Sequence, residues 1–453
     1  MDIVTTYERP QSPMIPWNRM KTILVLALPI IGGMCSEQII RVFDTMMIGF
    51  LGNQAIAALG LGSMVFSLMN SPLSGIPEAV QALVGRHFGS GRHELLKRPL
   101  MIGILMSLGL GGLMTGLSWV LVPIALKILI PDPAVQELGT RYCLVLSLGL
   151  TPLMVNFCFR SYWNGINQPL RYTIILIGTH LCTILLNGVL IFGFFGFPNL
   201  GVLGAAIGAS IIHLISMIVY SFSLGLSLTD WRSLRPLVVT EVIDECRAML
   251  KIAVPASLRN IFFILGILSF YWLVGFLGTD QVAIMHVHIQ LILFVILPGV
   301  GFGMTALSLV SQSLGRQNMD EAQQWGWDVT KLAVFVTIVV SVIGFLFPQW
   351  VLGAFIHDPT TLAQAIVPFR FECVFIWIEV AGLVLIQALV GVGQADRVFR
   401  ISLFAQWLLF FPLGCLLGPI LKTKLLFIIM AWVFYQLVAT GIFVMMWSKR
   451  EQW

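Results

Sequence analysis

The chain has 453 residues, of which 58% are hydrophobic and only 10% are charged. A soluble globular domain carries about 25% charged residues, so this composition excludes a soluble fold and makes the lipid bilayer the expected solvent. The formal net charge is +5. We interpret this charge as a signal of membrane topology, and we expect no nucleic-acid partner.

Long apolar stretches recur along the whole chain, and each continues for about 20 residues or more. This pattern is typical of membrane-spanning helices. It excludes an outer-membrane barrel, whose strands alternate in polarity over about ten residues. The predicted fold class is an all-α polytopic membrane protein with twelve transmembrane helices. The predicted spans are 22–49, 55–79, 99–126, 138–160, 172–195, 201–226, 248–276, 281–305, 329–353, 364–390, 398–420 and 425–447.

The loops between the predicted spans differ in charge. Most Arg and Lys residues of the loops lie on the side of the N-terminus, whereas the opposite loops hold Lys127, Lys422 and Lys424. Cytoplasmic loops of membrane proteins carry such an excess of basic residues. We therefore expect a multi-pass protein with both termini in the cytoplasm.

The second half of the chain repeats the first half at an offset of 226 residues. The letters GFLG occupy both 49–52 and 275–278, and IPDP at 130–133 corresponds to IHDP at 356–359. The repeat predicts two homologous six-helix bundles related by a pseudo-twofold axis along the membrane normal, as in transporters built of parallel repeats. The predicted divisions are a cytoplasmic N-terminal segment (1–21), an N-terminal lobe (22–226), a cytoplasmic linker (227–247), a C-terminal lobe (248–447) and a cytoplasmic tail (448–453).

Three sets of motifs resemble a known transporter family. FDTMMIGFLGNQAIAALGLG (43–62) is similar to the end of helix 1 and the start of helix 2 in multidrug and toxic compound extrusion (MATE) transporters. ALVGRHFGSGRHELL (82–96) and SLVSQSLGRQNMDEA (308–322) resemble the Gly-containing loops after helices 2 and 8. LNGVLIFGFFGFPNLGVLGAAIGAS (186–210) resembles the helix 5 to 6 connection of the NorM-like branch.

The resemblance implies a secondary antiporter with a MATE-like fold, in which two six-helix lobes form an outward-open V. Such proteins export organic cations and drugs, driven by inward flow of H⁺ or Na⁺. We therefore expect cationic, amphipathic small molecules as substrates and H⁺ or Na⁺ as the coupling ion. We expect no other cofactor, no enzymatic activity, and a monomer in the bilayer of the bacterial inner membrane.

Three charged residues lie within the first predicted span. Glu37, Arg41 and Asp44 follow one another at spacings of four and three, so they share one stripe of the helix, and Arg41 is placed to reach both acids. A charge inside the membrane is costly and points to function. One interpretation is a buried network that locks helix 1 into its lobe. The other is that at least one carboxylate binds the coupling ion, and the resemblance favours Asp44, which falls on the helix 1 Asp of the family.

Two further acids lie seven residues apart in the tenth predicted span. Glu379 matches the helix 10 acid of NorM-like members, whereas the helix 7 acid of that branch is replaced by Phe263. The equivalent residue of the first repeat is Glu37, so we hypothesise that part of the ion-binding charge has moved to the N-terminal lobe. Glu372 is interpreted either as a second coupling acid or as the partner of Arg370.

Other residues are candidates for supporting roles. Pro29 and Pro255 lie inside helices 1 and 7, where each permits a bend, either static or a moving hinge. Arg259 is expected to pair with an acid across the cavity or to snorkel. Asn187 matches a family position and needs a hydrogen-bond partner within its apolar span. Glu78 is interpreted as a satisfied surface or hinge acid.

The histidines of the spans are isolated in the sequence. We interpret them as packed or hydrogen-bonded side chains and not as proton relays, and their spacings predict no metal site. These residues are His180, His213, His286 and His288.

Three other functions are weaker alternatives. A flippase for a lipid-linked precursor belongs to the same superfamily, but such flippases often have more spans and a cationic cavity. A membrane enzyme is disfavoured, because the sequence has no HExxH motif, Gly-rich phosphate loop or convincing Ser/Lys constellation. A channel is disfavoured by the pseudo-symmetry within a single chain.

Overall fold

The computed structural model describes residues 15–129, 132–226, 239–356, 358–421 and 423–449. Within these ranges the chain forms helices and no strand. Eleven helices are long and apolar enough to cross a membrane, and the bent pair α5 and α6, with 48° between its halves, makes a twelfth span. The predicted fold class of twelve transmembrane helices is therefore confirmed.

The helices of the two halves follow the same order. In the first half they are α1 (Trp17–Gly49), α2 (Asn53–Asn70), η1 (Ser71–Leu73), α3 (Gly75–Gly89), η2 (His93–Leu95), α4 (Lys97–Leu129), α5 (Pro133–Ser147), α6 (Leu150–Gly165), α7 (Pro169–Phe192), η3 (Phe194–Gly196) and α8 (Val202–Leu224). In the second half they are α10 (Val239–Gly275), α11 (Thr279–Gly315), α12 (Met319–Leu346), α13 (Pro348–Gly353), α14 (Pro359–Gly391), α15 (Ala395–Phe404), η5 (Ala405–Phe410), α16 (Phe411–Cys415), η6 (Leu416–Ile420) and α17 (Leu425–Ser448).

Some boundaries differ from the predicted ones. Residues 82–89 and 308–315 are not loops, because they form the last turns of α3 and α11. The predicted linker 227–247 is partly helical, since α10 begins at Val239. The predicted span 329–353 is interrupted, because α12 ends before the short helix α13.

Parts of the predicted divisions fall outside the described residues. These parts are 1–14 of the N-terminal segment, 227–238 of the linker and 450–453 of the tail.

Local sequence sets several helix ends. Asp132 and Asp358 cap α5 and α14, because each carboxylate accepts a backbone N–H of the first turn, and a proline follows each in the first helical position. The hydroxyls of Thr360 and Thr361 also donate to Asp358, and these hydrogen bonds lower the pKa of that carboxyl to about 2. Gly193 ends α7 with φ of 75°, a conformation that glycine adopts without strain.

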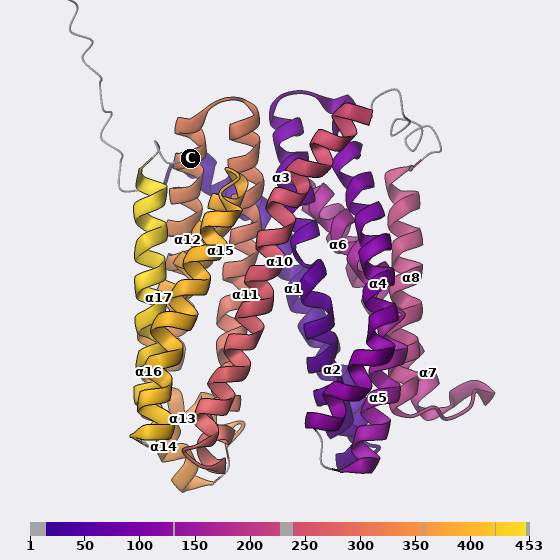
Figure 1. Cartoon of the computed structure of the whole chain (residues 1–453), viewed down its shortest axis with the longest axis vertical. Helices are drawn as coiled ribbons and strands as arrows, with labels where there is room; N and C mark the ends of the chain where they lie inside the picture. Colours follow the sequence, from indigo (N-terminus) through magenta and orange to yellow (C-terminus); the bar gives the residue numbers. More distant parts are fainter. Residues whose placement is uncertain (1–14, 130–131, 227–238, 357, 422, 450–453) are drawn as a thin grey trace, which may run out of the picture.

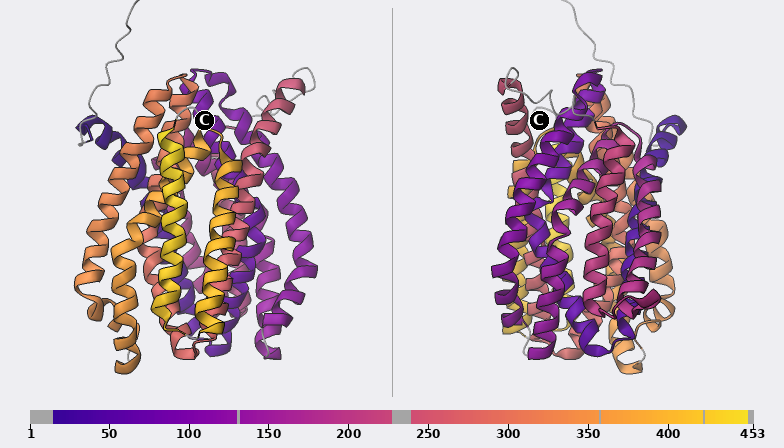
Figure 2. Two further views of the ribbon diagram at one scale, coloured as in Figure 1. Left: turned by 60° about the vertical axis from the view of Figure 1, so that its left-hand side comes forward. Right: turned by 90° about the vertical axis from the view of Figure 1, so that its right-hand side faces the viewer.

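The helices form two bundles that lie side by side, α1–α8 and α10–α17 (Figure 1). The N-terminal parts of α1 and α10 cross between them. Ile23 and Leu26 of α1 are buried in the core of the second bundle, and Met249 and Ile252 of α10 are buried in the core of the first. Figure 2 shows the start of α1, in indigo, beside the orange helices of the second bundle. Positions 23 and 26 are equivalent to 249 and 252 in the repeat, so the exchange follows the pseudo-twofold axis.

The two bundles are joined where α3 packs against residues 304–315 of α11, a contact that we call the inter-bundle seam. Glycines let the two backbones approach closely. A Cβ at Gly89 would lie 1.9 Å from the carbonyl oxygen of Gln312, and a Cβ at Gly315 would lie 2.1 Å from the carbonyl oxygen of Arg86. The seam lies in the half of the molecule that carries the C terminus (Figure 1).

The side chains at equivalent positions 86 and 312 reach across the seam. Arg86 Nη2 donates to the carbonyl oxygen of Gly391 at 3.0 Å, and Gln312 Nε2 donates to that of Gly165 at 2.8 Å. Both acceptors are the last residues of helices, α14 and α6, where carbonyl groups lack partners within the helix. Each bundle thus caps a helix of the other, and the contacts of the seam are self-complementary.

Candidate transport cavity and coupling residues

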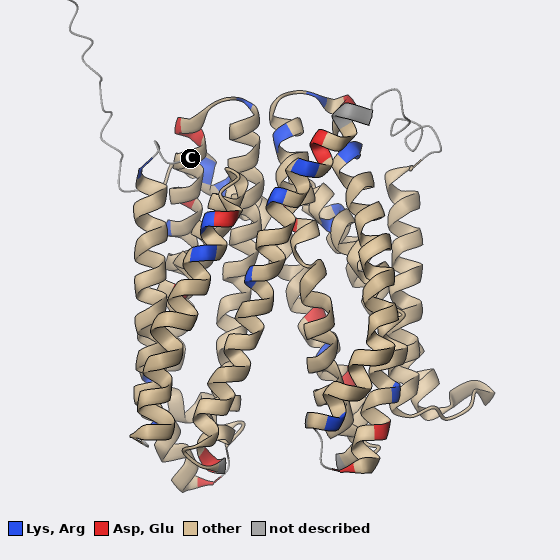
Figure 3. Cartoon of the chain, viewed as in Figure 1, with Lys and Arg blue, Asp and Glu red and all other residues tan. Residues whose placement is uncertain are grey.

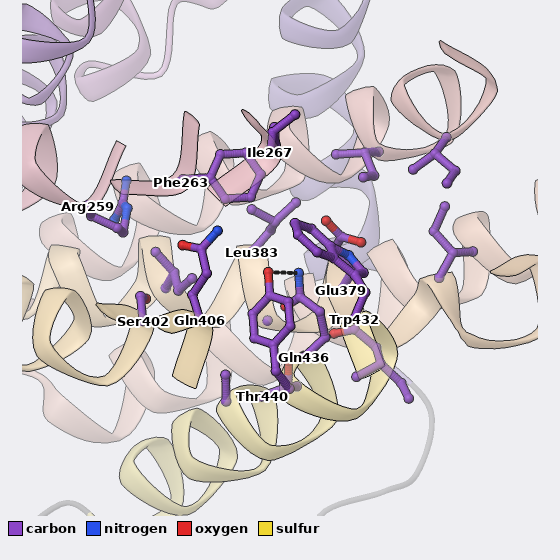
Figure 4. Close-up of a pocket in the computed structure, with 18 of the residues that line it drawn as sticks. Arg259, Phe263, Ile267, Glu379, Leu383, Ser402, Gln406, Trp432, Gln436 and Thr440 are labelled. Carbon is purple, nitrogen blue, oxygen red and sulfur yellow. Dashed lines mark hydrogen bonds between the residues drawn. The ribbon is translucent and has the colours of Figure 1, made fainter. Parts of the chain in front are cut away.

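A cavity of about 420 Å³ lies in the second bundle, between α10, α11, α14, α17 and residues 395–420. Its walls are mostly aliphatic and aromatic side chains, and Figure 4 shows several of them around the space. The charged residues of the described lining are Glu78, Arg259, Glu372 and Glu379. An apolar cavity with a few polar groups is the usual form of a small-molecule site.

Glu379 lies in the cavity next to α17 (Figure 4). Trp432 and Tyr435 of α17 lie beside its carboxylate, and Gln436 Nε2 donates to the Tyr435 hydroxyl at 3.0 Å. The Trp432 ring also stacks on Phe270 of α10, with ring centroids 5.1 Å apart. A carboxylate beside aromatic rings suits an organic cation, because both its charge and the ring faces attract positive charge.

Glu372 lies two helical turns from Glu379 on α14, and its partner is a histidine. His288 Nδ1 of α11 lies 3.2 Å from Glu372 Oε2, and both side chains are almost completely buried. Arg370, the partner that the sequence suggested, instead donates to the backbone carbonyl of Phe345 at 3.2 Å. That expectation is wrong because residues 370 and 372 point to different sides of α14, about 200° apart on a helix of 3.6 residues per turn.

Glu78 and Arg259 form an ion pair between the bundles, with Arg259 Nη2 2.8 Å from Glu78 Oε1. Both side chains are partly buried, at 21% and 15% exposed. Arg259 thus pairs with an acid of the other bundle and does not snorkel. The prediction that Glu78 is a satisfied acid is confirmed for Oε1, although Oε2 is buried without a partner among the described residues.

The three charged residues of α1 do not form one network. Arg41 Nη2 donates to Glu37 Oε1 at 3.1 Å, whereas Asp44 Oδ1 accepts a hydrogen bond from Asn187 Nδ2 of α7 at 2.7 Å. The sequence had suggested that Arg41 reaches both acids. In the structure it bonds to Glu37 alone. The physical reason is that helical side chains lean toward the N-terminus, so Arg41 reaches back to the residue four positions earlier.

The position of α1 in its bundle depends on α7. Besides the Asp44–Asn187 bond, Ser36 Oγ lies 2.9 Å from His180 Nδ1, and Thr173 Oγ1 donates to the carbonyl oxygen of Pro29 at 2.9 Å. The Glu37–Arg41 pair joins two turns of one helix, so it cannot lock α1 to a neighbour.

Pro29 and Pro255 both lie inside continuous helices, α1 and α10, as predicted. Each follows directly on the turns that pack into the opposite bundle. The two prolines therefore stand where a helix passes from one bundle to the other. Among the described residues, no group of three or more His, Cys, Asp or Glu side chains is arranged to hold a metal ion.

Comparison with known families tests the sequence-based expectation directly. The MatE family model matches residues 29–189 and again residues 255–416, which together make up most of the chain. The chain belongs to the MatE family. The two matches begin at Pro29 and Pro255, 226 residues apart, so they coincide with the internal repeat.

Curated relatives of this MatE chain are named probable multidrug resistance protein NorM. The relative from Geobacillus kaustophilus is 25% identical over 410 residues, which cover 89% of each chain. The relative from Neisseria meningitidis serogroup A is 26% identical over 418 residues, covering 90% of this chain and 88% of its own.

Solved structures confirm the MATE fold. A transporter of the MOP superfamily from Pyrococcus furiosus, described as having a binding pocket of reverse polarity that suggests a different function, matches with a TM-score of 0.86 at 18% identity over 95% of each chain. A Vibrio cholerae MATE transporter matches with a TM-score of 0.86 at 16% identity, over 95% of this chain and 96% of its own.

Some residues of this MatE site were not singled out by the sequence reading. His288 was interpreted as a packed histidine, because its partner Glu372 lies far from it in the sequence. Gln406 of η5 was missed as well, although it lines the cavity and its Nε2 is buried without a partner among the described residues. Pro412 and Pro419, in the same predicted span, were the available signal of an irregular helix there.

Proposed function

We propose that this chain is a secondary multidrug efflux antiporter that exports cationic, amphipathic compounds in exchange for inward H⁺ or Na⁺, and that it works as a monomer. The observation that carries the proposal is the Glu379 carboxylate in a cavity of about 420 Å³ whose other walls are mostly apolar and aromatic. The NorM relatives are named probable multidrug resistance proteins, which supports drug efflux.

The charge of the cavity favours cations over anions. Glu78 and Arg259 neutralise each other, so Glu372 and Glu379 leave the described lining with an acidic excess. A cationic drug and a coupling ion would both be attracted to these carboxylates, and competition for the same negative charge produces exchange. The cationic cavity expected of a lipid-precursor flippase would have the opposite balance.

We infer that the end with the inter-bundle seam faces the cytoplasm of a bacterial cell and that the protein lies in the inner membrane. Lys and Arg gather in the half of the molecule that carries the C terminus (Figure 3). Cytoplasmic ends of membrane proteins carry this excess of basic residues. With that orientation, the seam closes the cytoplasmic side, and the structure corresponds to an outward-open state.

The proposed cycle follows from these positions. In the outward-open state, the coupling ion binds at Glu379 and at the acids of α1, Asp44 and Glu37, which weakens the attraction for a bound cation. The cation then leaves to the outside. The bundles rock, the seam opens, and the ion is released to the cytoplasm, after which a new cation binds.

The direct test is ethidium efflux from reconstituted vesicles, with a pH gradient or a Na⁺ gradient imposed separately. The variants are Asp44→Asn, Glu37→Gln and Glu379→Gln, with Glu137→Gln as the matched control, because that acid is exposed and pairs only within α5. We expect efflux in the wild type and the control that depends on one gradient, and loss of efflux with Glu379→Gln.

The outcomes separate the hypotheses. Loss of coupling in Asp44→Asn would locate part of the ion site in the first bundle, and unchanged coupling in Glu37→Gln would argue against the relocation of charge to that bundle. A protein that moves a fluorescent lipid-linked precursor between leaflets but never ethidium would overturn the proposal in favour of the flippase. Ethidium flux that ignores both gradients would indicate a channel.

A further inference from the structure

His288 and Glu372 form an isolated polar pair in an otherwise apolar part of the second bundle. The His288 side chain is completely buried, and Glu372 is 8% exposed. Their closest approach is 3.2 Å, yet neither ring nitrogen of His288 makes a well-aligned hydrogen bond with any described residue, nor does Glu372 Oε2. A buried imidazole and a buried carboxylate without other partners are costly, so the pair calls for an explanation beyond packing.

The other bundle shows that the fold does not require this pair. The equivalent positions in the first repeat are Gly62 and Leu146. A Cβ at Gly62 would lie 2.7 Å from the ring of Tyr142, so an aromatic side chain fills the space there. The equivalent place in the first bundle thus holds Gly62, Leu146 and the ring of Tyr142, with neither an acid nor a histidine, which indicates that the fold itself does not need the pair.

We propose that His288 and Glu372 together bind one proton and that H⁺ is the coupling ion of this transporter. The inference rests on the proposed antiport, which left the ion open between H⁺ and Na⁺. With one bound proton the pair is neutral overall, and without it the pair has a charge of −1. Loading and unloading a single proton therefore changes the charge of the cavity wall by one unit, which is what competition with a monovalent cation requires.

The surroundings of the pair suit a proton better than Na⁺. Hard cations such as Na⁺ prefer several oxygen ligands, whereas imidazole nitrogen is a poor ligand for them and a good proton acceptor. Glu372 has as neighbours His288, the ring of Phe369, which lies 5.6 Å from the imidazole, and the thiol of Cys373. With the hydroxyl of Ser341, which lines the same cavity, these groups supply one carboxylate, one hydroxyl and one imidazole, fewer oxygen ligands than a Na⁺ site usually has.

The titratable groups around the pair come from few helices. From α14 they are Glu372, Cys373 and Glu379, and the carboxylates of Glu372 and Glu379 interact electrostatically. The stretch of α12 that faces Glu372 contributes the side chains of Val340, Ser341 and Ile343, none of which titrates. Helix α10 contributes Tyr271, whose hydroxyl lies 3.2 Å from His286 Nδ1 of α11. Helix α17 contributes Tyr435, which lies beside Glu379. Arg259 lines the same cavity but pairs with Glu78, and among the described residues His288 is the only basic side chain within ion-pair distance of Glu372.

The pair also has a position from which a proton can move. Glu372 lines both the large cavity and a second cavity of about 220 Å³ between α11, α12 and α14. Glu379 stands two turns further along α14, about 10 Å toward the seam. A proton taken from external water at Glu372 and His288 can pass to Glu379 through water in the large cavity and return to water on the cytoplasmic side after the seam opens.

The test measures ethidium binding to the purified protein in detergent as a function of pH, in sodium buffers and in potassium buffers. The variants are His288→Gln and Glu372→Gln, and the matched control is His286→Gln, because His286 is bonded to Tyr271 outside the pair. Gel filtration and thermal unfolding check that each variant is folded. Glu372→Gln keeps the shape of the side chain, so the test stands even where His288→Gln does not fold.

We expect acidification by one pH unit to weaken ethidium binding to the wild type and to His286→Gln by about tenfold, the effect of one displaced proton. We expect the same values in sodium and in potassium. In His288→Gln and Glu372→Gln, the change should fall below about threefold per pH unit. If the pair had a merely structural role, its variants would change the affinity for ethidium but would leave the change in affinity per pH unit as in the wild type.

Two results would overturn the inference. One is a folded Glu372→Gln protein with the wild-type pH slope, and the other is wild-type binding that responds to Na⁺ and not to pH. In both cases ethidium is still bound, so the proposed antiport remains. Failure of the proposed function looks different, because the wild type would then either fail to export ethidium or let it pass regardless of both the pH gradient and the Na⁺ gradient.

Discussion

At the scale of single residues, the two acids of α1 differ in their partners. Glu37 pairs with Arg41 on its own helix, and the Arg41 side chain is 63% exposed. Asp44 accepts a hydrogen bond from Asn187, which is completely buried. An exposed pair one turn apart contributes little to stability, whereas a hydrogen bond to a charged group from a buried amide contributes about 1.5–3 kcal/mol.

The position of Asn187 depends on a glycine of the neighbouring helix. A Cβ at Gly208 of α8 would lie 2.0 Å from Asn187 Oδ1. We expect Gly208→Ala to push the amide away from Asp44 and to lower the free energy of unfolding by about 2 kcal/mol, without altering either bonded residue. Thermal unfolding in detergent measures this loss.

The control for that prediction is Gly188→Ala, next to Asn187 in sequence, where a Cβ would have no neighbour within 4 Å. The control should be at least as stable as the wild type, because alanine favours a helix more than glycine does. Equal unfolding temperatures for the two variants would contradict the argument.

How far the residues of the site could be predicted depends on where their partners lie. Glu379 and Asp44 could be predicted as site residues because the motifs around them are local. His288 and Glu372 are 84 positions apart, and Arg259 and Glu78 are 181 positions apart, so only the packing of helices reveals these pairs. Charge alone suggested Arg370 as the partner of Glu372, and the helix geometry decided otherwise.

At the scale of elements, the segment from α15 to η6 is the least regular helix of the described chain. Residues 405–410 and 416–420 adopt the wider π-helical turn. Pro412 and Pro419 lie within or next to these turns and lack the N–H that a regular helix would use. Local π-turns are frequent at functional sites, and this one places Gln406 in the cavity wall.

Gln406 has an unpaired amide nitrogen in a buried place, close against Gly266 of α10. We expect Gln406→Leu to raise the free energy of unfolding by about 1–3 kcal/mol, because the unsatisfied donor is removed. We also expect the variant to export ethidium more slowly, because the cavity wall loses a polar side chain that can contact a bound cation.

Thermal unfolding and vesicle efflux, measured on the same preparation, check both parts of the Gln406 prediction. Gln436→Leu is the matched control, since that amide already donates to Tyr435 and its loss should lower stability. A Gln406→Leu protein that is less stable than the wild type would show that the amide has a partner after all.

The element boundaries show what a hydropathy pattern can and cannot predict. The apolar core of each span was found, because lipid selects for it. The ends of α3 and α11 were placed in loops, since residues 82–89 and 308–315 carry glycines and polar side chains. In the folded chain those glycines serve close helix packing at the seam, and the polar groups bond across it.

At the scale of the whole molecule, the seam is the feature that must break for the bundles to rock. Gly89→Ala or Gly315→Ala would place a methyl group about 2 Å from a backbone oxygen of the other bundle. Backbone cannot move aside locally, so we expect each variant to separate the bundles at the seam and to reduce ethidium efflux at least tenfold, a cost of about 1.4 kcal/mol or more.

Distances between spin labels on the loops 90–92 and 316–318 report the separation directly. Gly116→Ala in α4 is the control, because a Cβ there would meet nothing within 4 Å. Label distances in the Gly89→Ala protein that match the wild type would contradict this account of the seam.

The Glu78–Arg259 ion pair stabilises the same closed arrangement by charge. We expect Arg259→Gln to shift the protein toward the seam-open state by a factor of about 5–150, the range for a coupling of 1–3 kcal/mol, because it leaves a partly buried Glu78 unpaired. The reversed pair, Glu78→Arg with Arg259→Glu, should restore much of the closed population. The same spin labels measure both populations.

Exchange of the exposed pair Arg400–Asp396, which lies within α15 of the second bundle, is the matched control. It should leave the populations unchanged. A reversed Glu78–Arg259 pair that behaves like the single variant would show that the two charges act separately.

The internal repeat predicted two bundles and their pseudo-twofold axis, and the structure has both. It did not predict that the N-terminal parts of α1 and α10 pack in the opposite bundle. Ile23 and Leu26 read as ordinary apolar residues of a span, and only the fold shows that they belong to the core of the opposite bundle. The predicted lobe limits at 22 and 248 therefore do not coincide with the division of the packing between the two bundles.

The self-complementary contacts of the seam are those of a twofold homodimer. Gly89 contacts Gln312, and the equivalent Gly315 contacts Arg86. In the same way, Arg86 caps the helix that ends at Gly391, and Gln312 caps the helix that ends at Gly165. Each half therefore presents the same surface to the other. A six-helix ancestor encoded by a single gene could have paired with itself through this surface. The Glu78–Arg259 pair breaks that equivalence, since the repeat places Met304 and Gly33 at the matching positions. This ion pair favours contact between the two different halves over contact between identical ones, so we expect two halves produced as separate chains to prefer each other.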